Sequence, residues 1–586
     1  MKLPSPYTAC VLALACTIVA CNQQPVEVPT DPQTVACALS GTDFANWFQS
    51  GTVAKDGIVN SPNSLAFQGI QNDMFPNCNF YQWAEQAFLW VTSPAPANYG
   101  GKGRVFDSPV FFDVSPPDTN GNRTLIPHTE TGIHFMAVRT AQAGPHRLPI
   151  VFSKAGRMLE IEEPPTAPDG KQLILDRSGQ PVEIQEIKPT TFGRPVFLDK
   201  NGRPITGAHP LFRTLHATTS IVERFIVGGS PVFMDVFGDI VQVETGQADG
   251  GVVLTQGNSL IYYLVMVNDV YAYFRTGISD GHITAGGFPS NSSDMQSIKA
   301  FAAANNKTFP DSNAMAVEIK SSWVLASSLP DPADYFTITA AVPHYNKTPL
   351  QWTLVPNVMD TVQLAMIGMH VVGAVQAHPE LVWSTFVHTG VAPDTTYTYA
   401  SGAQSGLTTV QANTNGTWLL CASGAQPLYN QLKMTYANGN IVATSGNTIG
   451  PSNIITMKPW GGAADVEPNS FDGNPQNSNA EVISINNSVR NALIAGDLRK
   501  NYIFRGATWT GGAAPTPPPA FGPDPLGGDE FGTTSLANVT METFQQGNTS
   551  IFTGTNCFTC HQNSNTQIQT ADTGVSHIFS TLKPLF

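Results

Sequence analysis

Apolar residues recur at helical spacing in the stretch that follows Asn79. Phe80, Trp83, Ala84, Ala87, Phe88 and Val91 fall at positions i, i+3, i+4, i+7, i+8 and i+11. This spacing predicts a helix that Asn79 caps and that turns Trp83 into the core. Three further stretches carry the pattern or the end signals of helices: 259–274, which ends before Gly277, 294–304 and 481–494.

Runs of apolar and β-branched residues predict strands in the second half of the chain. They cover 316–326, 335–342, 361–376, 381–390 and 501–509. The run at 361–376 is apolar on both faces, which is typical of a central strand buried between two layers. Earlier in the chain, 175–182 and 198–205 echo one another, each with a Ser-Gly or Asn-Gly pair between aliphatic residues. Both predict tight β-hairpins, because Gly readily adopts the positive φ that such turns need.

The composition agrees with a large, exported, β-rich protein. Only 12% of the 586 residues are charged, while Gly (51) and Pro (45) are plentiful. We therefore predict a mainly β fold with several helices (a β-rich α+β fold), in which residues 37–509 form a large β-sandwich-like body of one or two subdomains. Pro and Gly dominate 510–532, interpreted as a linker to a C-terminal segment, 533–586, that opens with a short helix. The net charge of −14 argues against a nucleic-acid partner.

The N-terminus has the pattern of an export signal. Lys2 precedes an apolar run over residues 9–20 that is too short to span a membrane as a helix. The run ends in Ile18-Val19-Ala20-Cys21, which resembles the lipobox of bacterial lipoproteins. We therefore predict a signal peptide at 1–20, a lipid anchor on Cys21 and a polar tether at 21–36, with a soluble secreted protein as the alternative. The residue after Cys21 is Asn22 and not the Asp that holds lipoproteins at the inner membrane. We therefore expect an outer-membrane or periplasm-facing lipoprotein, with the cell surface as a further location.

Three cysteines remain after the signal, the anchor and the C-terminal motif are set aside. Cys37, Cys78 and Cys421 are an odd number in an oxidising compartment. We expect one disulfide and one buried thiol, and the sequence leaves the pairing open.

The C-terminal motif Cys557-Phe558-Thr559-Cys560-His561 carries the most specific chemistry. Cys-x-x-Cys-His is the attachment sequence of a c-type haem, in which two thiols form thioethers with the vinyl groups and the His binds the iron. The alternatives are a redox dithiol, which usually follows a strand in a βαβ unit, and half of a zinc site, which needs a second pair of ligands. We assign one covalent haem c to Cys557 and Cys560, with His561 as the proximal iron ligand.

Residues 533–561 resemble the N-terminal helix and haem-binding turn of a class I cytochrome c. The chain as a whole resembles a group of large exported bacterial cytochrome c family proteins that carry a single C-terminal haem motif. This likeness rests on "NFYQWAEQAFLWVTSP", "IGMHVVGAVQAHPELVWSTFVHTG", "LRKNYIFRGATW" and "LANVTMETF". The class I pattern is incomplete, because only 25 residues follow His561 and none of them is Met.

A segment as short as 533–586 cannot bury both faces of a haem, so we expect this small helical haem segment to dock on the β-rich body. The residue on the open side of the iron separates electron transfer from peroxide or oxygen chemistry. His577 is the leading candidate for this sixth position. Met541, His370, His388 and an open position are the alternatives.

These observations predict a monohaem c-type cytochrome lipoprotein that passes single electrons to or from another redox protein. Two other classes remain open. One is a haem enzyme of the peroxidase or oxygenase type, with a substrate pocket in the body. The other is a surface-binding lipoprotein whose haem is structural or sensory.

Overall fold

A computed structural model provides the structure of the chain. It describes residues 25–33, 37–67, 77–100, 103–116, 122–128, 133–138, 150–152, 158–162, 164–169, 171–188, 195–211, 221–227, 230–241, 252–284, 286–402, 406–425, 433–437, 440–443, 447–460, 475–512, 530–534, 536–542, 557–561 and 572–586. The predicted signal peptide, Cys21 and most of the Pro/Gly linker lie outside these residues. Within them, none of the helices has the length and hydrophobicity that a membrane crossing requires.

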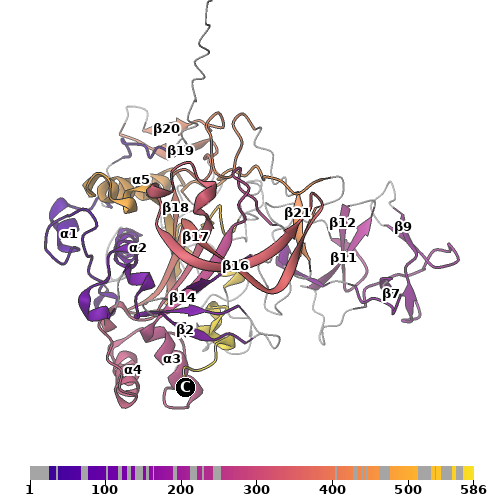
Figure 1. Cartoon of the computed structure of the whole chain (residues 1–586), viewed down its shortest axis with the longest axis horizontal. Coiled ribbons are helices and arrows are strands. Elements are labelled where there is room, and N and C mark those ends of the chain that lie inside the picture. Colours follow the sequence, from indigo (N-terminus) through magenta and orange to yellow (C-terminus); the bar gives the residue numbers. More distant parts are fainter. Residues whose placement is uncertain are drawn as a thin grey trace, which may run out of the picture.

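One large sheet organises the body (Figure 1). Its main path runs β2-β1-β14-β15-β17-β18-β23-β24, and β16 pairs with β17. The strands of this path and β16 are β1 (Phe111–Val114), β2 (Leu125–Pro127), β14 (Tyr262–Asn268), β15 (Val317–Leu325), β16 (Thr337–Lys347), β17 (Gln351–Val375), β18 (His378–His388), β23 (Tyr502–Thr510) and β24 (Glu530–Gly532). The five predicted strands are confirmed, and most of the 361–376 run, from residue 364 to residue 375, forms the buried half of β17.

Four short strands extend this sheet, and one hairpin lies apart from it. The short strands are β3 (His134–Phe135), β4 (Ala137–Val138), β21 (Met434–Ala437) and β22 (Asn440–Ala443), and the hairpin joins β19 (Tyr397–Ala400) to β20 (Leu407–Val410). Together with the helices described next, they confirm the predicted β-rich α+β fold.

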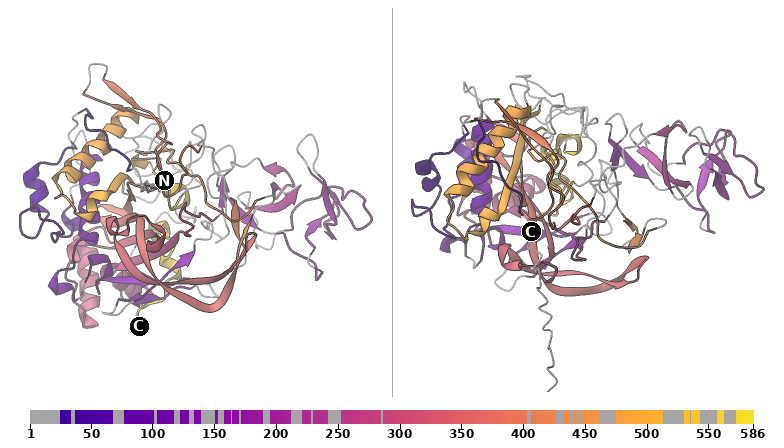
Figure 2. Two further views of the ribbon diagram at one scale, coloured as in Figure 1. Left: turned by 45° about the horizontal axis from the view of Figure 1, so that its top comes forward. Right: turned by 90° about the horizontal axis from the view of Figure 1, so that it is seen from above.

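Helices cover one face of the large sheet. The helix α2 (Asn77–Thr92) packs on β17, β18 and β23 beside α5 (Pro475–Ala492), and α1 (Gly41–Asn46) packs against α5 (Figure 2). The predicted helix is confirmed with Trp83 buried, although it begins at Asn77 and not after a cap at Asn79. Trp83 lies so close to β17 that a Cβ at Gly373 would come within 2.8 Å of its ring.

The prediction of one helix at 259–274 is wrong in its first half. Residues Tyr262–Asn268 form β14, which pairs with β1 and β15, and the helix α3 (Asp269–Ser279) starts only afterwards. The Asn268 side chain accepts the Tyr271 N–H at 3.0 Å, so it caps α3. Gly277 lies inside α3 and does not stop it. A Cβ there would come within 2.5 Å of Ile283 Cδ1, so close packing explains this glycine. The predicted helix at 294–304 is confirmed as α4 (Ser292–Ala304).

The opposite face of the sheet is covered by α3, α4 and the C-terminal end of the chain. Side chains alternate between the two faces along β18: Val382 and Phe386 lie in the core with α2, whereas Leu381 and Trp383 lie in the core with Phe558. The ring of Phe386 stacks on Phe88 of α2 at 4.1 Å. The central strand β18 is therefore buried on both of its faces.

A small β lobe stands to one side of the body (Figure 1). It contains a five-stranded sheet, β13-β12-β11-β6-β5, and the paired strands β7–β8 and β9–β10. Its strands are β5 (Ile150–Phe152), β6 (Met158–Glu162), β7 (Leu173–Leu175), β8 (Pro181–Glu183), β9 (Glu186–Lys188), β10 (Val196–Leu198), β11 (Ile221–Val227), β12 (Ser230–Asp235) and β13 (Ile240–Val241).

The two predicted hairpin turns are confirmed in this lobe. Gly179 and Gly202 have φ of +76° and +71°, and the carboxylates of Asp176 and Asp199 each accept two backbone N–H groups of their own turns. A third turn, after Asp235, repeats the arrangement without having been predicted.

One disulfide joins Cys37 to Cys78, with a Cα–Cα distance of 4.7 Å. Cys421 is a buried free thiol, so the predicted count of one disulfide and one thiol is confirmed. The disulfide connects the N-terminal residues to the start of α2. Residues 25–33, within the range assigned to the tether, lie along the body, where Val26 N–H donates to Thr389 O at 2.8 Å.

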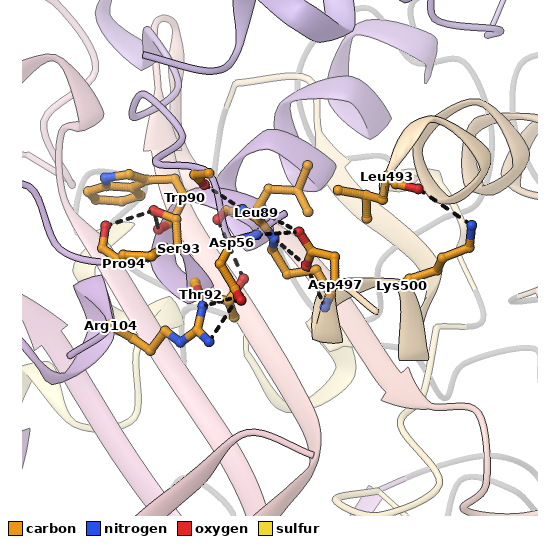
Figure 3. A network of polar contacts seen from close by, with 12 residues as sticks. Asp56, Leu89, Trp90, Thr92, Ser93, Pro94, Arg104, Leu493, Asp497 and Lys500 are labelled. Carbon is orange, nitrogen blue, oxygen red and sulfur yellow. Dashed lines mark hydrogen bonds and ion pairs between the residues drawn. The ribbon is translucent and has the colours of Figure 1, made fainter. Parts of the chain in front are cut away.

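A polar network holds the other end of α2 (Figure 3). Arg104 pairs with Asp56 at 3.1 Å and donates to the carbonyl of Thr92 at 3.0 Å. The Asp56 N–H in turn donates to Asp497 Oδ2 at 3.1 Å, close to the end of α5. The N-terminal residues and the helix layer are thus fixed to one another.

We expect Glu85 of α2 to make the folded protein less stable as the pH rises. It is 3% exposed, its Oε1 has no hydrogen-bond partner among the described residues, and burial, only partly offset by Arg490, raises its pKa to about 8. The pKa of Glu85 in the folded protein lies above its pKa in the unfolded chain. The protonated Glu85 therefore contributes its full share to the unfolding free energy below about pH 4.5, and this share is lost as the pH rises through about 8. This loss is on the order of 4 kcal/mol.

Glu85→Gln should therefore flatten the decline in unfolding free energy between pH 5 and pH 9, measured by urea denaturation. Glu186→Gln, at a side chain that is 57% exposed, is the control and should follow the wild type. An equal decline in the Glu85 variant would contradict the assignment.

Candidate functional site

The motif forms a single helical turn. The helix α6 (Cys557–Cys560) is closed by the His561 N–H, which donates to Cys557 O at 2.9 Å. Cys557 and His561 therefore occupy positions i and i+4, which share one face of a helix. Between them, Phe558 is fully buried, with its ring 6.1 Å from Trp383 of β18.

His561 is oriented by its neighbours. Its Nδ1–H donates to the carbonyl of Val575 at 2.8 Å, which leaves Nε2 as the nitrogen with a free lone pair. The ring packs against Trp383 at 4.2 Å and stacks on His577 at 4.1 Å, with an angle of 17° between the two imidazoles. Metal-binding histidines usually donate their other ring N–H to a carbonyl or carboxylate in this way.

A hollow lies between the motif and the sheet. It contains about 570 Å³ of space that no protein atom fills, and this volume includes space that is open to solvent. The residues that line it are Glu318, Lys320, His370, Val372, Trp383, Ser384, Leu536, Glu542, Cys557 and His561.

Strand register builds the floor of this hollow. Lys320 of β15 lies opposite His370 of β17, and Glu318 lies opposite Val372, which in turn faces Trp383 of β18. Because side chains two residues apart point to the same face, the three strands present these residues together. The floor therefore comes from the body, while Cys557 and His561 form part of the wall.

The Glu542 carboxylate is the centre of the polar contacts in the hollow. It lies 2.9 Å from His370 Nε2 and 3.3 Å from Lys320 Nζ, and it accepts the Asn538 N–H at 3.1 Å. The nearby Glu318 accepts the Ser576 hydroxyl at 2.7 Å. Acid, imidazole and ammonium groups therefore share one partly enclosed space with the motif.

Burial shifts the titration of two groups in this space. It raises the pKa of Glu318 to about 7, against the opposing effects of the Ser576 hydrogen bond and of Lys320. It also holds the pKa of His561 well below its usual range, with His577 adding to the effect. The His561 ring is therefore neutral at physiological pH.

Residues 536–542 do not form the helix that the sequence predicted. They form a turn that packs on the sheet. Asn538 Nδ2 donates to Thr385 Oγ1 at 2.7 Å, and Thr540 Oγ1 lies 2.6 Å from Ser322 Oγ. Gly368 allows this close approach, because a Cβ there would come within 2.7 Å of Thr540 Oγ1. Side-chain bonds to the strands replace the intrahelical bonds.

The last residues anchor the motif from the other side. Residues 572–586 form short 3-10 turns rather than a closing helix, and Val575, Ile578 and Phe579 pack with α3. Tyr271 lies 2.8 Å from Ser576, and Arg275 Nε donates to Phe579 O at 2.6 Å. This anchoring holds Val575 where its carbonyl meets His561.

The candidates for the sixth position lie in different surroundings. His370 lines the hollow, whereas His577 is exposed and stacks on His561 outside the lining residues. Imidazole lone pairs lie in the ring plane, so two stacked rings do not bind one ion from opposite sides as they lie here. His388 and Met541 are buried away from the lining, and Cys21 lies outside the described part of the chain.

The residues present fit a covalent haem. A turn with two cysteine positions and one histidine, an oriented Nε2 and a hollow with both apolar and polar walls are what such a group requires. Glu542, Lys320, Glu318 and Val575 were missed from the sequence. The signal in the sequence was the alternation of Glu318 and Lys320 with Val317 and Ile319, which indicates a polar face on this strand.

No family model, curated protein or solved structure matches this chain. The assignment of the site therefore rests on the residues that form it.

Replacing Phe558 by Ala should release the motif from the sheet. Removing a fully buried Phe costs about 3–5 kcal/mol, which corresponds to a rise of roughly a hundredfold or more in local opening. Hydrogen exchange of peptides that contain 557–561 and 572–586 should accelerate accordingly. Phe237→Ala, at a position 69% exposed in the small lobe, is the control and should leave these peptides unchanged. Unaltered exchange in the Phe558 variant would contradict the packing role.

Proposed function

We propose that this chain is an exported monohaem c-type cytochrome that passes single electrons to or from another redox protein. Cys557 and Cys560 would hold the haem covalently, and His561 Nε2 would bind its iron. The bound haem would supply a one-electron Fe(III)/Fe(II) couple. The observation that carries the proposal is the hydrogen bond from His561 Nδ1–H to Val575 O, which directs the other nitrogen to a ligand.

The surroundings of the motif support a role for the body in this function. Trp383 and Val372 offer apolar contact to a haem face that the short C-terminal segment cannot cover. The Cys37–Cys78 disulfide supports an oxidising compartment, where c-type haem is attached. The lipobox-like Cys21 supports anchoring of the chain to a membrane surface by acyl chains.

Covalent attachment is tested by expressing the full chain with a cytochrome maturation system. The denatured wild-type protein should keep its colour and the mass of one haem. Cys557→Ala combined with Cys560→Ala should lose both, whereas Cys421→Ala, which removes the buried thiol elsewhere, should retain them. A colourless wild type under these conditions would overturn the proposal.

A haem enzyme is the second candidate, and the polar floor of the hollow favours it. His370 and Lys320 each lie within hydrogen-bond or ion-pair distance of Glu542 beside the motif. Such a set can take up and return protons during peroxide or oxygen chemistry. In this case the sixth position would be open to a substrate.

The ferrous absorption spectrum with and without carbon monoxide separates the two candidates. We expect the wild type to keep its six-coordinate spectrum, as an electron carrier does. Because His370 lines the hollow and His577 does not, His370→Ala should create carbon monoxide binding and His577→Ala should not.

Ready binding of carbon monoxide by the wild type would instead support the enzyme. Conversion by His577→Ala alone would show that His577 is the ligand and that the C-terminal segment rearranges around the haem.

A further inference from the structure

A second group of metal-ligating side chains lies at the edge of the large sheet. Asp113 of β1, His128 after β2 and His134 of β3 bring their ligand atoms within 4.8 Å of one another. Their side chains are 5, 6 and 4% exposed. Their spacing in the sequence does not reveal the group, because 14 residues separate Asp113 from His128 and only the sheet brings them together.

The outer nitrogen of each imidazole already has an acceptor. His128 Nδ1 lies 3.2 Å from the Ser108 carbonyl, and His134 Nε2 lies 2.9 Å from Asp107 Oδ1. A carbonyl and a carboxylate only accept hydrogen bonds, so both outer nitrogens carry the N–H. This arrangement fixes the tautomer of each ring and orients it, as acceptors behind metal-binding histidines do.

The inner nitrogens both face the carboxylate of Asp113. His128 Nε2 lies 2.6 Å from its Oδ1, and His134 Nδ1 lies 2.8 Å from its Oδ2. A neutral imidazole has only one N–H, so these nitrogens direct lone pairs at oxygen atoms that also carry lone pairs. Such a buried contact is favourable only with positive charge between the atoms.

We propose that Asp113, His128 and His134 bind one divalent transition-metal ion, with Asp107 as a positioning residue behind His134. Two imidazoles and one carboxylate are a donor set for Zn²⁺, Fe²⁺ and their neighbours in the first transition row. One divalent ion supplies the two positive charges that two imidazolium protons would otherwise bring.

The three ligands come from separate parts of the fold. It joins β1, the residue after β2, and β3, and β3 pairs with Ala340 and Ala341 of the long strand β16. The Asp107 side chain, 37% exposed, is the part of the cluster that reaches solvent. A bound ion would therefore fix one edge of the sheet independently of the haem motif.

The test uses the full chain, freed of metal by a chelator and dialysed against a series of Zn²⁺ buffers. The wild type should bind one tight zinc per chain, counted by elemental mass spectrometry, and zinc should raise its melting temperature. Asp113→Asn and His128→Gln should lose this zinc and its thermal effect. Asp107→Asn should weaken binding by roughly 10- to 100-fold, as outer partners of metal ligands do.

His344→Gln is the matched control, because His344 forms a similar contact with Asp360 at 2.8 Å but on an exposed surface. It should leave the zinc count unchanged. A wild type that binds no tight zinc, or tight zinc that persists in both ligand variants, would overturn the proposal and identify the cluster as a hydrogen-bond network. If Asp113→Asn does not fold, His128→Gln, outside the strands, gives the decisive result.

Discussion

A sheet with two apolar faces must be covered on both of them. The segments that cover the second face of this sheet also place the residues around the motif. The helices α2 and α5 cover one face. The other is covered by α3, α4 and C-terminal residues, and the turn at 536–542 carries the Glu542 carboxylate into this buried layer. A buried charge needs several donors. His370, Lys320 and the Asn538 N–H supply them, which fixes the turn on the strands.

This constraint explains why the motif comes after the strands of the large sheet in the sequence. The motif turn needs a rigid surface, and the strands that supply it are complete only after β23 and β24 have joined the sheet. The residues that would tune a bound haem therefore belong to the body: Trp383 packs against His561, and His370 lies across the hollow. The C-terminal segment would supply the cysteines that attach a haem, and the strands of the sheet would supply the side chains around it.

Local pattern predicted most of the elements and few of the contacts. The strands around β17 follow from their runs of apolar and β-branched residues, and the helix α2 follows from the helical spacing of its apolar residues. The structure of 259–274 did not follow from the pattern. The apolar positions of Tyr262–Asn268 are compatible with a helix as well as with a strand, and only pairing with β1 and β15 decides between the two. The motif residues stood out in the sequence because their spacing is that of a c-type haem attachment site. The Val575 partner of His561 and the His370 donor to Glu542 were not predictable, because loop docking places the first and the packing of the 536–542 turn on the strands places the second, 172 residues away in the sequence.

The histidines also show why burial alone is a poor guide to metal binding. His388 is among the buried histidines, and burial lowers its pKa to about 3. Its Nε2 lies 3.3 Å from Asp334 O, and its Nδ1 accepts the Gly390 N–H at 3.1 Å, so a neutral ring satisfies both contacts and keeps no lone pair. In His561, His128 and His134 one nitrogen donates to an acceptor and the other is directed to a place where a cation would be favourable. The two kinds of histidine differ in whether the second ring nitrogen accepts a hydrogen bond from the protein. The acceptors behind the first nitrogen, which are backbone carbonyls and a carboxylate, decide which nitrogen this is, and sequence spacing does not reveal them.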